Sequence, residues 1–341
     1  SADSFGETGD YGEWKPIAYA GTYGTNGFYL PFEQDYAVEG FSTVVYGGNG
    51  SSGHYIGGVG FSPDLLWIKE RTSTSSHRLF DTVRGASIRL ESNTTAAEAT
   101  DTTNMTSFDT DGFTLGNSGS VNASSDDYVA WNWDMGGTTA SNTSGSITSS
   151  VRANTTYGQS IVSYTGNATA GATVGHGLSS APTMIIIKSR AAARNWTVGH
   201  SGVGWTKFLQ INSTNAAETA TNRWNDTAPS STVFTLGSTG NSNSAEAVIA
   251  YCFHDVTGYS KFGSYTGNGS TTGPVVTLGF TPAFVMYKNA DSTTSWRMHD
   301  SVRGDDFFVY ADQSAAEGSA DQIQFTSTGF EIVSTSSTIN T

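Results

Sequence analysis

The sequence predicts an all-β protein in which three tandem β-sandwich repeats follow an N-terminal segment. Three observations carry this prediction: the composition favours turns and strands, one apolar motif occurs three times, and no long segment has helical periodicity. Glycine occurs 40 times in 341 residues, and charged residues make up only 13%. Aromatic residues reach 12%, so the segments between polar runs can form cores, which a disordered chain cannot do.

The first segment, residues 1–40, matches none of the repeats. Its Gly/aromatic stretch at 23–32 predicts an ordered strand-and-turn piece that serves for attachment. The first residue is Ser1 and no signal peptide is visible, so we expect that the numbering starts inside a longer or processed chain. A membrane span requires about 18 consecutive apolar residues. The sequence has no such run, so we expect no membrane insertion.

A proline followed by an apolar run that ends in lysine marks each repeat. The motif occurs at residues 61–69, 180–188 and 280–288, with offsets of 119 and 100 positions. The apolar part of each run has the length of a strand and is too short for a helix. A strand that is apolar on both faces lies inside a sandwich core or between packed layers.

Further strands are expected in short apolar runs between clusters of Gly, Asn, Ser and Thr. These runs are residues 160–164, 208–211, 275–278 and 307–310. Each copy has about 100 residues, the size of a complete jelly-roll or immunoglobulin-like sandwich. The sequence therefore predicts antiparallel strands joined by turns, and it leaves the strand order open.

The repeats and the linker between them have recognisable boundaries. We assign the first repeat to residues 41–136, a Gly/Ser/Thr linker to 137–156, the second repeat to 157–256 and the third to 257–341. The composition of the linker predicts a flexible or extended segment and not a further core.

The third repeat is shorter than the others by one apolar run. Residues 128–131 close the first repeat and residues 248–253 close the second, but no such run follows in the third before Thr341. A sandwich without that strand has an unpaired edge, which soluble proteins normally cover. We therefore expect that a neighbouring subunit, or residues beyond Thr341, complete this apparently incomplete repeat.

An Ala-Ala-Glu motif preceded by Thr, Asn or Ser occurs once in each repeat. Residues 95–98, 215–218 and 314–317 place a capping side chain three positions before a glutamate. This spacing is typical of a capping box, in which the two side chains satisfy backbone amides at a helix start. The motif therefore predicts one short helical turn in each repeat.

The sequence contains no common catalytic or metal-binding motif. There is no P-loop, no Gly-x-Ser-x-Gly elbow and no His-x-x-x-His pair. Neighbouring acids at 126–127 and 305–306 are interpreted as solvated turn residues or weak Ca²⁺ ligands, and 109–112 as a turn and not a calcium loop. We therefore expect no enzyme activity, no catalytic residue, no cofactor and no metal.

The net charge of −14 limits the classes of partner. An acidic surface repels phosphates, so nucleic acid and anionic lipid are poor candidates. The single cysteine, Cys252, lies in an apolar run and is expected to be a buried thiol. Asp81 with Arg84, and Asp300 with Arg303, are interpreted as structural ion pairs that fix a turn.

Four tryptophans that lie close to Asn, Ser or Thr in the sequence are candidate ligand-binding residues: Trp196, Trp205, Trp224 and Trp296. His77 joins them because it aligns with Trp196 and Trp296. Exposed aromatic rings flanked by polar groups are suited to stacking on sugars. The alternative is that these tryptophans belong to the core, as most tryptophans of a β-sandwich do.

Five segments of the first repeat form one recognisable pattern: residues 61–69, 77–85, 96–98, 108–116 and 128–133. This pattern resembles a repeat that is common in structural proteins of marine tailed bacteriophages, and the stretch at 23–32 resembles the one that precedes such repeats. The resemblance covers nearly the whole chain and is more specific in the first copy than in the other two. It implies a lectin-like β-sandwich in a tail-fibre or virion-appendage protein, and it supplies no catalytic residues.

The resemblance also implies a location and partners. It implies a virion, an extracellular particle that is assembled in the host cytoplasm, with other virion proteins as partners. Phage fibres are commonly homotrimers, so a homo-oligomer is expected, and a host-surface glycan or receptor is the expected ligand. Two alternatives stay open: a capsid-surface decoration or head-fibre protein, and a polysaccharide depolymerase, which would need paired carboxylates in a groove.

Overall fold

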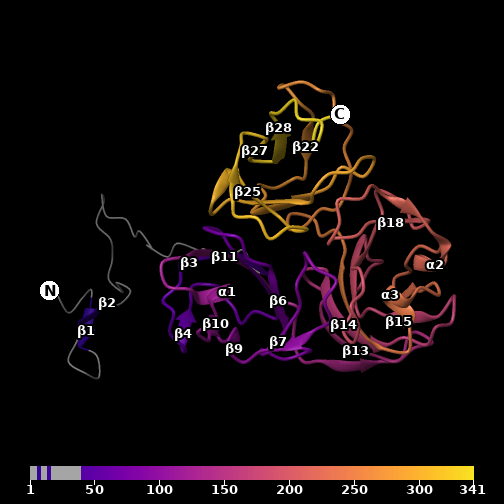
Figure 1. Ribbon diagram of the computed structural model, residues 1–341, viewed down its shortest axis with the longest axis horizontal. Coiled ribbons are helices and arrows are strands. Elements are labelled where there is room, and N and C mark those ends of the chain that lie inside the picture. Colours follow the sequence, from indigo (N-terminus) through magenta and orange to yellow (C-terminus); the bar gives the residue numbers. More distant parts are fainter. Residues whose placement is uncertain (1–5, 9–13, 17–39) are drawn as a thin grey trace, which may run out of the picture. The chain divides into compact units, whose positions relative to one another are not determined.

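The computed structural model describes residues 6–8, 14–16 and 40–341 of the chain (Figure 1). Of these residues, 38% lie in strands and 4% in helices. The expectation of an all-β protein with only single helical turns is therefore confirmed. Within the described residues, no helix has the length and apolar character that a membrane crossing requires.

The N-terminal part forms a unit of its own, Ser1–Asp35. In it, β1 (Gly6–Thr8) and β2 (Trp14–Pro16) form a two-stranded antiparallel sheet. The rest of the expected attachment segment, including residues 23–32, lies outside the described residues.

The first copy contains two main sheets. The four-stranded sheet has the order β3 (Phe41–Gly47), β11 (Asp127–Trp133), β5 (Leu65–Glu70), β6 (Arg78–Asp81). The three-stranded sheet has the order β4 (His54–Ile56), β10 (Gly112–Leu115), β9 (Met105–Asp109). Shorter elements are β7 (Ile88–Arg89), β8 (Ala99–Thr100) and α1 (Gly119–Asn122). Residues of both sheets, among them Ile68 and Phe113, form one buried apolar cluster.

The second copy is built around a six-stranded sheet. Its order is β12 (Ala140–Asn142), β13 (Ser149–Asn154), β14 (Gln159–Thr165), β21 (Ala247–Phe253), β16 (Met184–Ser189), β17 (Thr197–His200). Four short strands form two pairs, β15 (Thr173–Gly175) with β20 (Val233–Thr235) and β18 (Lys207–Phe208) with β19 (Glu218–Thr219). The helices are α2 (Thr221–Trp224) and α3 (Gly240–Asn243).

The segment 137–156 is not a free linker, as the composition had suggested. It supplies β12 and β13, and β13 pairs with β14 along its whole length. Ile147 and Val151 are 7% and 6% exposed and belong to the apolar cluster of the second copy. The prediction was wrong because Ser and Thr suit the solvent face of a strand, so a few well-spaced apolar residues are enough to dock the segment.

The third copy also has two main sheets. One has the order β23 (Phe284–Tyr287), β24 (Arg297–Asp300), β25 (Gly304–Tyr310), β26 (Gly318–Ser319). The other has the order β22 (Val275–Thr277), β28 (Gly329–Ile332), β27 (Ile323–Thr326). The three apolar runs that the sequence motif marks are thus strands β5, β16 and β23, as expected.

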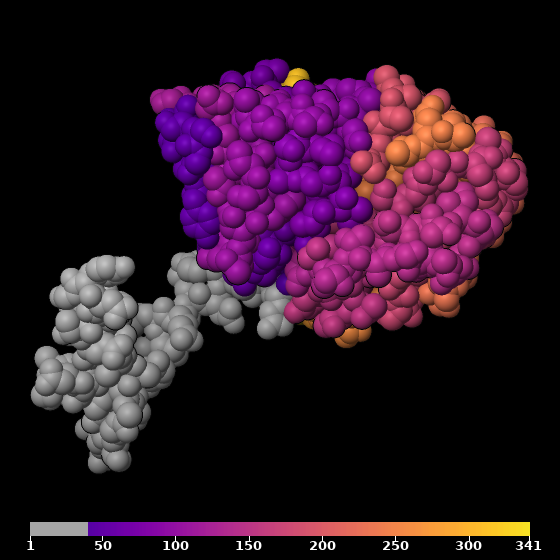
Figure 2. Space-filling view, turned by 90° about the horizontal axis from the view of Figure 1, so that it is seen from below, coloured from indigo at the N-terminus to yellow at the C-terminus, as the bar shows by residue number. Residues whose placement is uncertain are grey.

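One apolar cluster is shared by all three copies, which Figure 1 shows as successive groups of strands from indigo to yellow. It contains Trp67 and Trp131 of the first copy, Trp196 and Ile249 of the second, and Met298 of the third. On the face shown in Figure 2, the surfaces of the first and second copies meet along a continuous boundary. Strands β5 and β16 are buried on both faces because each lies between its own cluster and this shared core.

The three Ala-Ala-Glu segments are not helical, so the predicted capping boxes are wrong. Residues 95–98 have no helical turn, and neither do 215–218 or 314–317. Their backbone groups bond to a neighbouring copy instead, as described below. Real caps occur elsewhere, since the Ser118 and Thr239 side chains accept backbone hydrogen bonds at the starts of α1 and α3.

Candidate functional site

The contacts between copies repeat around the shared core. Each copy sends one ring N–H from the start of a strand to a backbone carbonyl oxygen of another copy. The pairs are Trp196 Nε1 with Glu91 O (2.9 Å), Trp296 Nε1 with Gln210 O (2.9 Å), and His77 Nε2 with Tyr310 O (2.8 Å). The three donors and the three acceptors are each separated by 119 and 100 positions, so the same contact is made three times.

Each of the three junctions also has two backbone hydrogen bonds. They run from Arg194 N to Thr95 O and from Glu98 N to Arg190 O; from Thr294 N to Thr214 O and from Ala217 N to Ala290 O; and from Ser75 N to Ser314 O and from Glu317 N to Arg71 O. These bonds satisfy the backbone groups of the Ala-Ala-Glu segments. This use of the backbone explains why those segments are extended and not helical.

Two of the three junctions add a bidentate ion pair. Arg190 donates to Glu98 over 2.7 and 3.0 Å, and Arg71 donates to Glu317 over 2.9 and 2.8 Å. The remaining junction has Ala217 and Ala290 at the corresponding positions, so the acid and the base are absent together. Two-point Arg–carboxylate contacts fix geometry more strictly than single ones.

The lysine that ends each repeated motif is buried or half-buried, and its ammonium group donates to backbone carbonyl oxygens. The side chains of Lys69 and Lys188 are 0% exposed, and Lys288 is half-buried. Lys188 Nζ donates to the carbonyl oxygen of Thr95 over 3.1 Å, which joins the second copy to the first. Desolvation by burial lowers the pKa of all three lysines from 10.5 to about 8.

The two Asp–Arg pairs are buried and fix turns, as expected. Arg84 Nε lies 2.5 Å from Asp81 Oδ2, and both side chains are 0% exposed. The Asp81 Oδ1 atom accepts the backbone amide of Arg84 over 2.9 Å. Tyr251 of the second copy donates its hydroxyl to Asp81 over 2.8 Å, so this pair also joins two copies.

The second pair repeats this arrangement at another junction. Arg303 Nε lies 2.6 Å from Asp300 Oδ2, and both side chains are again 0% exposed. The indole Nε1 of Trp131, from the first copy, donates to Asp300 Oδ2 over 3.0 Å. The side chains of β11 and β21 thus each reach a buried carboxylate of another copy.

The structure does not bring the candidate ligand-binding residues together on a surface. His77 and Trp196 are 0% exposed, Trp224 is 1% and Trp296 is 4% exposed. The expectation of exposed rings is therefore wrong for these four residues. The buried ring N–H groups of Trp196 and Trp296 find their acceptors in backbone carbonyls of another copy and not in their polar sequence neighbours. Trp205 is half-buried and packs edge-on against Trp224, with ring centroids 5.2 Å apart.

Asp111 and Cys252 are two groups of a type that could carry chemistry. Asp111 accepts the backbone amides of Gly60 and Gly58 over 2.6 and 3.2 Å, which fixes a turn. Desolvation raises the pKa of the buried Cys252 thiol. Among the described residues, no three His, Cys, Asp or Glu side chains are grouped so that they could hold a metal ion.

A partly enclosed cavity of about 850 Å³ lies beside β23 of the third copy. Its walls include Phe262, Phe284 and Met286 of that copy and His200 of the second copy. Desolvation lowers the pKa of His200, so this side chain is neutral near pH 7. The cavity offers an apolar lining with a few polar groups, which is the general character of a binding site.

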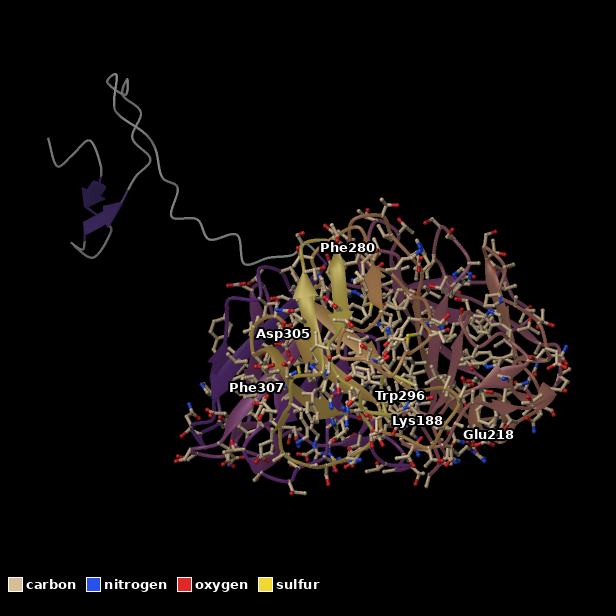
Figure 3. The ribbon with its side chains drawn as sticks, turned by 90° about the horizontal axis from the view of Figure 1, so that it is seen from above. Lys188, Glu218, Phe280, Trp296, Asp305 and Phe307 are labelled. Carbon is tan, nitrogen blue, oxygen red and sulfur yellow. The ribbon has the colours of Figure 1, made fainter. Side chains whose placement is uncertain are left out.

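Exposed aromatic residues lie away from this cavity. Tyr55 is 52% exposed and Phe307, labelled in Figure 3, is 38% exposed. Sequence reasoning did not select either residue, because exposure depends on which face of a short strand packs inward.

Comparison with known proteins identifies one family. The family described as "Domain of unknown function (DUF7483)" matches residues 37–341. No curated protein and no solved structure matches the chain.

Proposed function

Because the chain belongs to the DUF7483 family, whose description assigns no function, we propose a function from its own residues. It is a structural protein of a phage virion, a tail fibre or appendage, that contacts a glycan or receptor on the host surface. Each copy is one lectin-like β-sandwich of a tandem array. Its partners are other virion proteins, and no turnover of substrate is part of the role.

The observation that carries this proposal is the set of equivalent contacts around the shared core. Three titratable side chains, Asp81, Asp300 and His77, lie at the junctions and form hydrogen bonds with another copy. Buried polar networks whose members are all satisfied make a structure rigid. A rigid block with an acidic surface is suited to a particle appendage, and the repeated motif supports the same reading through its resemblance to virion proteins.

Host contact requires exposed groups, and the structure limits the choice. Among the described residues, Tyr55 and Phe307 are the exposed aromatic residues, so their rings are the first candidates for stacking on a sugar. A glycan array with the purified chain tests this role. We expect that Tyr55→Ala removes binding to the glycans that the unchanged chain retains, while this variant keeps its unfolding midpoint within the error of the measurement.

Imaging of virions labelled on this protein tests the location. Label on the tail supports the fibre, whereas label on the head shows the decoration protein that remains the alternative. A reducing-end assay on host polysaccharide tests the third class. Sugar release by the purified chain would show a depolymerase and contradict the structural role.

A further inference from the structure

A second cavity, of about 540 Å³, lies where the first copy meets strand β13 of the second copy. We call it the β13 pocket. Residues of the stretches 61–64, which precedes β5, and 134–137, which follows β11, form one wall. Residues 152–155, at the end of β13 and just after it, form the other wall. The volume is within the range of small-ligand sites, which is about 300–1,000 Å³.

Three contacts hold the two walls of the β13 pocket together. Arg152 Nη2 lies 2.7 Å from Asp64 Oδ1, and Arg152 Nε donates to the carbonyl oxygen of Gly136 over 2.8 Å. Gly136 has a φ of +88°, and a Cβ atom at this position would lie 2.3 Å from the carbonyl oxygen of Ala153. Only glycine permits this backbone conformation together with this close approach. The pocket is therefore preformed by the fold.

Three side chains that line the pocket keep unused hydrogen-bonding atoms. Asp134 Oδ1 accepts the backbone amide of Gly136 over 2.7 Å, but Asp134 Oδ2 has no donor among the described residues. Arg152 uses Nε and Nη2 in the contacts between the walls, and no described residue accepts from its Nη1. Asn154 Oδ1 accepts two backbone amides, each over 3.2 Å, and Nδ2 is without an acceptor in the described part of the chain. The pocket thus offers one carboxylate acceptor and two donors.

An aromatic ring and two hydroxyl groups complete the lining. Phe61 is half-buried and packs against the apolar cluster of the first copy, so its ring is held in place from one side. Ser62 and Thr155 are exposed, and their hydroxyl groups can donate and accept hydrogen bonds. An apolar ring beside convergent polar groups is the combination that binds a ligand with an apolar face and polar edges.

The charges of the lining residues decide between classes of ligand. The carboxylates of Asp64 and Asp134 outnumber the single guanidinium of Arg152, so an anionic ligand is repelled. A metal ion is not favoured, since no three His, Cys, Asp or Glu side chains are grouped for one among the described residues. An apolar ligand would leave the polar atoms of the pocket desolvated and unpaired. A neutral ligand with several hydroxyl groups fits, because a hydroxyl donates to a carboxylate and accepts from a guanidinium or an amide.

We propose that the β13 pocket binds one neutral sugar unit. Its hydroxyl groups form hydrogen bonds with Asp134 Oδ2, Arg152 Nη1 and Asn154 Nδ2. Its C–H face packs on the ring of Phe61. The proposal rests on the glycan contact of the proposed function and adds a separate site to it, since the lining of the pocket includes neither Tyr55 nor Phe307.

The first copy alone carries this combination of residues. The offsets that align the copies place Thr183 and Ala283 at the position of Asp64. Asp134 follows Trp131 by three positions, and the residue at the same distance from Tyr251 in the second copy is His254. Neither aligned position in the second copy has a carboxylate, so we expect one sugar site for each chain.

The test is a nuclear magnetic resonance titration of the whole chain with the methyl glycosides of glucose, galactose and mannose. We expect that at least one of them shifts the amide signals of 134–137 and 152–155 in a saturable way. The expected Kd is about 1 mM, which is the affinity that the binding energy per atom of small ligands gives for a monosaccharide. Saturable shifts confined to other residues, or none with any of the three sugars, overturn the proposal.

Two variants separate the pocket from effects on folding. Gly137 lines the pocket, has no positive φ, and has no atom within 4 Å of an added Cβ, so Gly137→Trp fills the pocket without strain and abolishes the shifts. Gly263→Trp is the matched control, because this glycine also has free space and lies outside the pocket. Asp134→Ala weakens binding about tenfold through the loss of one hydrogen bond to a charged group, whereas Asp321→Ala, at an exposed position outside the pocket, does not. Full binding by Gly137→Trp contradicts the site.

The titration and the glycan array distinguish this site from the proposed function. A single sugar unit bound with a Kd of about 1 mM is not retained on an array, so the array measures the contact through Tyr55. Glycans retained on the array, with no shifts at 134–137, overturn the β13 pocket and leave the proposed function in place. Shifts at 134–137 that Gly137→Trp abolishes, with no glycan retained on the array, support the pocket and contradict the host contact through Tyr55.

Discussion

The indole Nε1 of Trp67 donates a 2.7 Å hydrogen bond to Nδ1 of His77, whose Nε2 lies 2.8 Å from the carbonyl oxygen of Tyr310. Both ring nitrogens of His77 are therefore used, one as acceptor and one as donor. The second copy has Trp196 at the position of His77 and Ile186 at the position of Trp67. Isoleucine has no side-chain N–H that needs an acceptor, so Trp196, whose indole can only donate, is compatible with it. The residue at the position of Trp67 therefore depends on the residue at the position of His77.

This dependence predicts a double-mutant cycle. His77→Trp lowers the free energy of unfolding by about 1–3 kcal/mol, because the buried N–H of Trp67 loses its acceptor. Adding Trp67→Ile recreates the pair of the second copy. We expect that the free energy of unfolding of the double variant, measured by urea denaturation, is about 1 kcal/mol or more higher than the sum of the two single effects would give. Additive effects would show that the two side chains are not coupled.

Stability falls in acid because buried histidines must become charged. Desolvation lowers the pKa of His77 from 6.5 to about 3 and that of His299 to about 4. Between these values and 6.5, the unfolded chain binds a proton that the folded chain does not, so protons favour unfolding. The stabilising effect is complete above about pH 6.5 and is lost as the pH falls towards 4.

Urea denaturation at steps from pH 7 to pH 5 measures this slope, above the range in which most carboxylates titrate. The variant that combines Trp67→Ile with His77→Trp lacks one of the two histidines. We expect a shallower fall for it than for the unchanged chain. An identical slope in both proteins would exclude His77 as a source of the pH dependence.

The buried lysines produce a change of the same origin and sign in alkali. The pKa of Lys188 is about 8 in the folded chain and 10.5 ordinarily. Between pH 8 and 10.5 the unfolded chain holds the proton and the folded chain has released it, so stability rises with pH. We expect that Lys188→Met reduces this rise between pH 8 and 9.5, below the range where tyrosines titrate. Lys261→Met, at an exposed position, is the control and keeps the full slope.

Glu317 stabilises a junction through two cations. It accepts from Arg71 and, over 2.7 Å, from Arg303, whose side chain is 0% exposed. Glu317→Gln therefore lowers the free energy of unfolding by about 1.5–3 kcal/mol, because hydrogen bonds to charged groups are lost beside a buried guanidinium. Thermal denaturation measures the effect.

Glu218, next to the counterpart of Glu317 in the second copy, provides an exposed control. It is exposed, it is labelled in Figure 3, and its junction pairs Ala217 with Ala290 and not an acid with a base. We expect that Glu218→Gln changes the stability by less than about 0.5 kcal/mol. Equal losses for both variants would mean that the ion pairs add nothing to the junctions.

The sequence determined the features that depend on near neighbours. The strands β5 and β16 follow from short apolar runs between proline and lysine, because a run without a polar face needs burial on both sides. The ion pair of Asp81 with Arg84 spans one turn and is fixed by spacing along the chain. Offsets of 119 and 100 positions also revealed the three copies before any contact was known.

Only the tertiary structure decided what depends on distant partners. Residues 95–98 have the spacing of a capping box, but Glu98 is held by Arg190, 92 positions away, and the local signal does not include that partner. The ring of Trp196 is buried for the same reason, since its acceptor is the carbonyl of Glu91 in another copy. The residue types determine which side chains need burial and which polar groups need a hydrogen-bond partner. The packing of three copies around one core decides which partner each group finds, because the free energies of burial and hydrogen bonding arise from contacts between segments far apart in the chain.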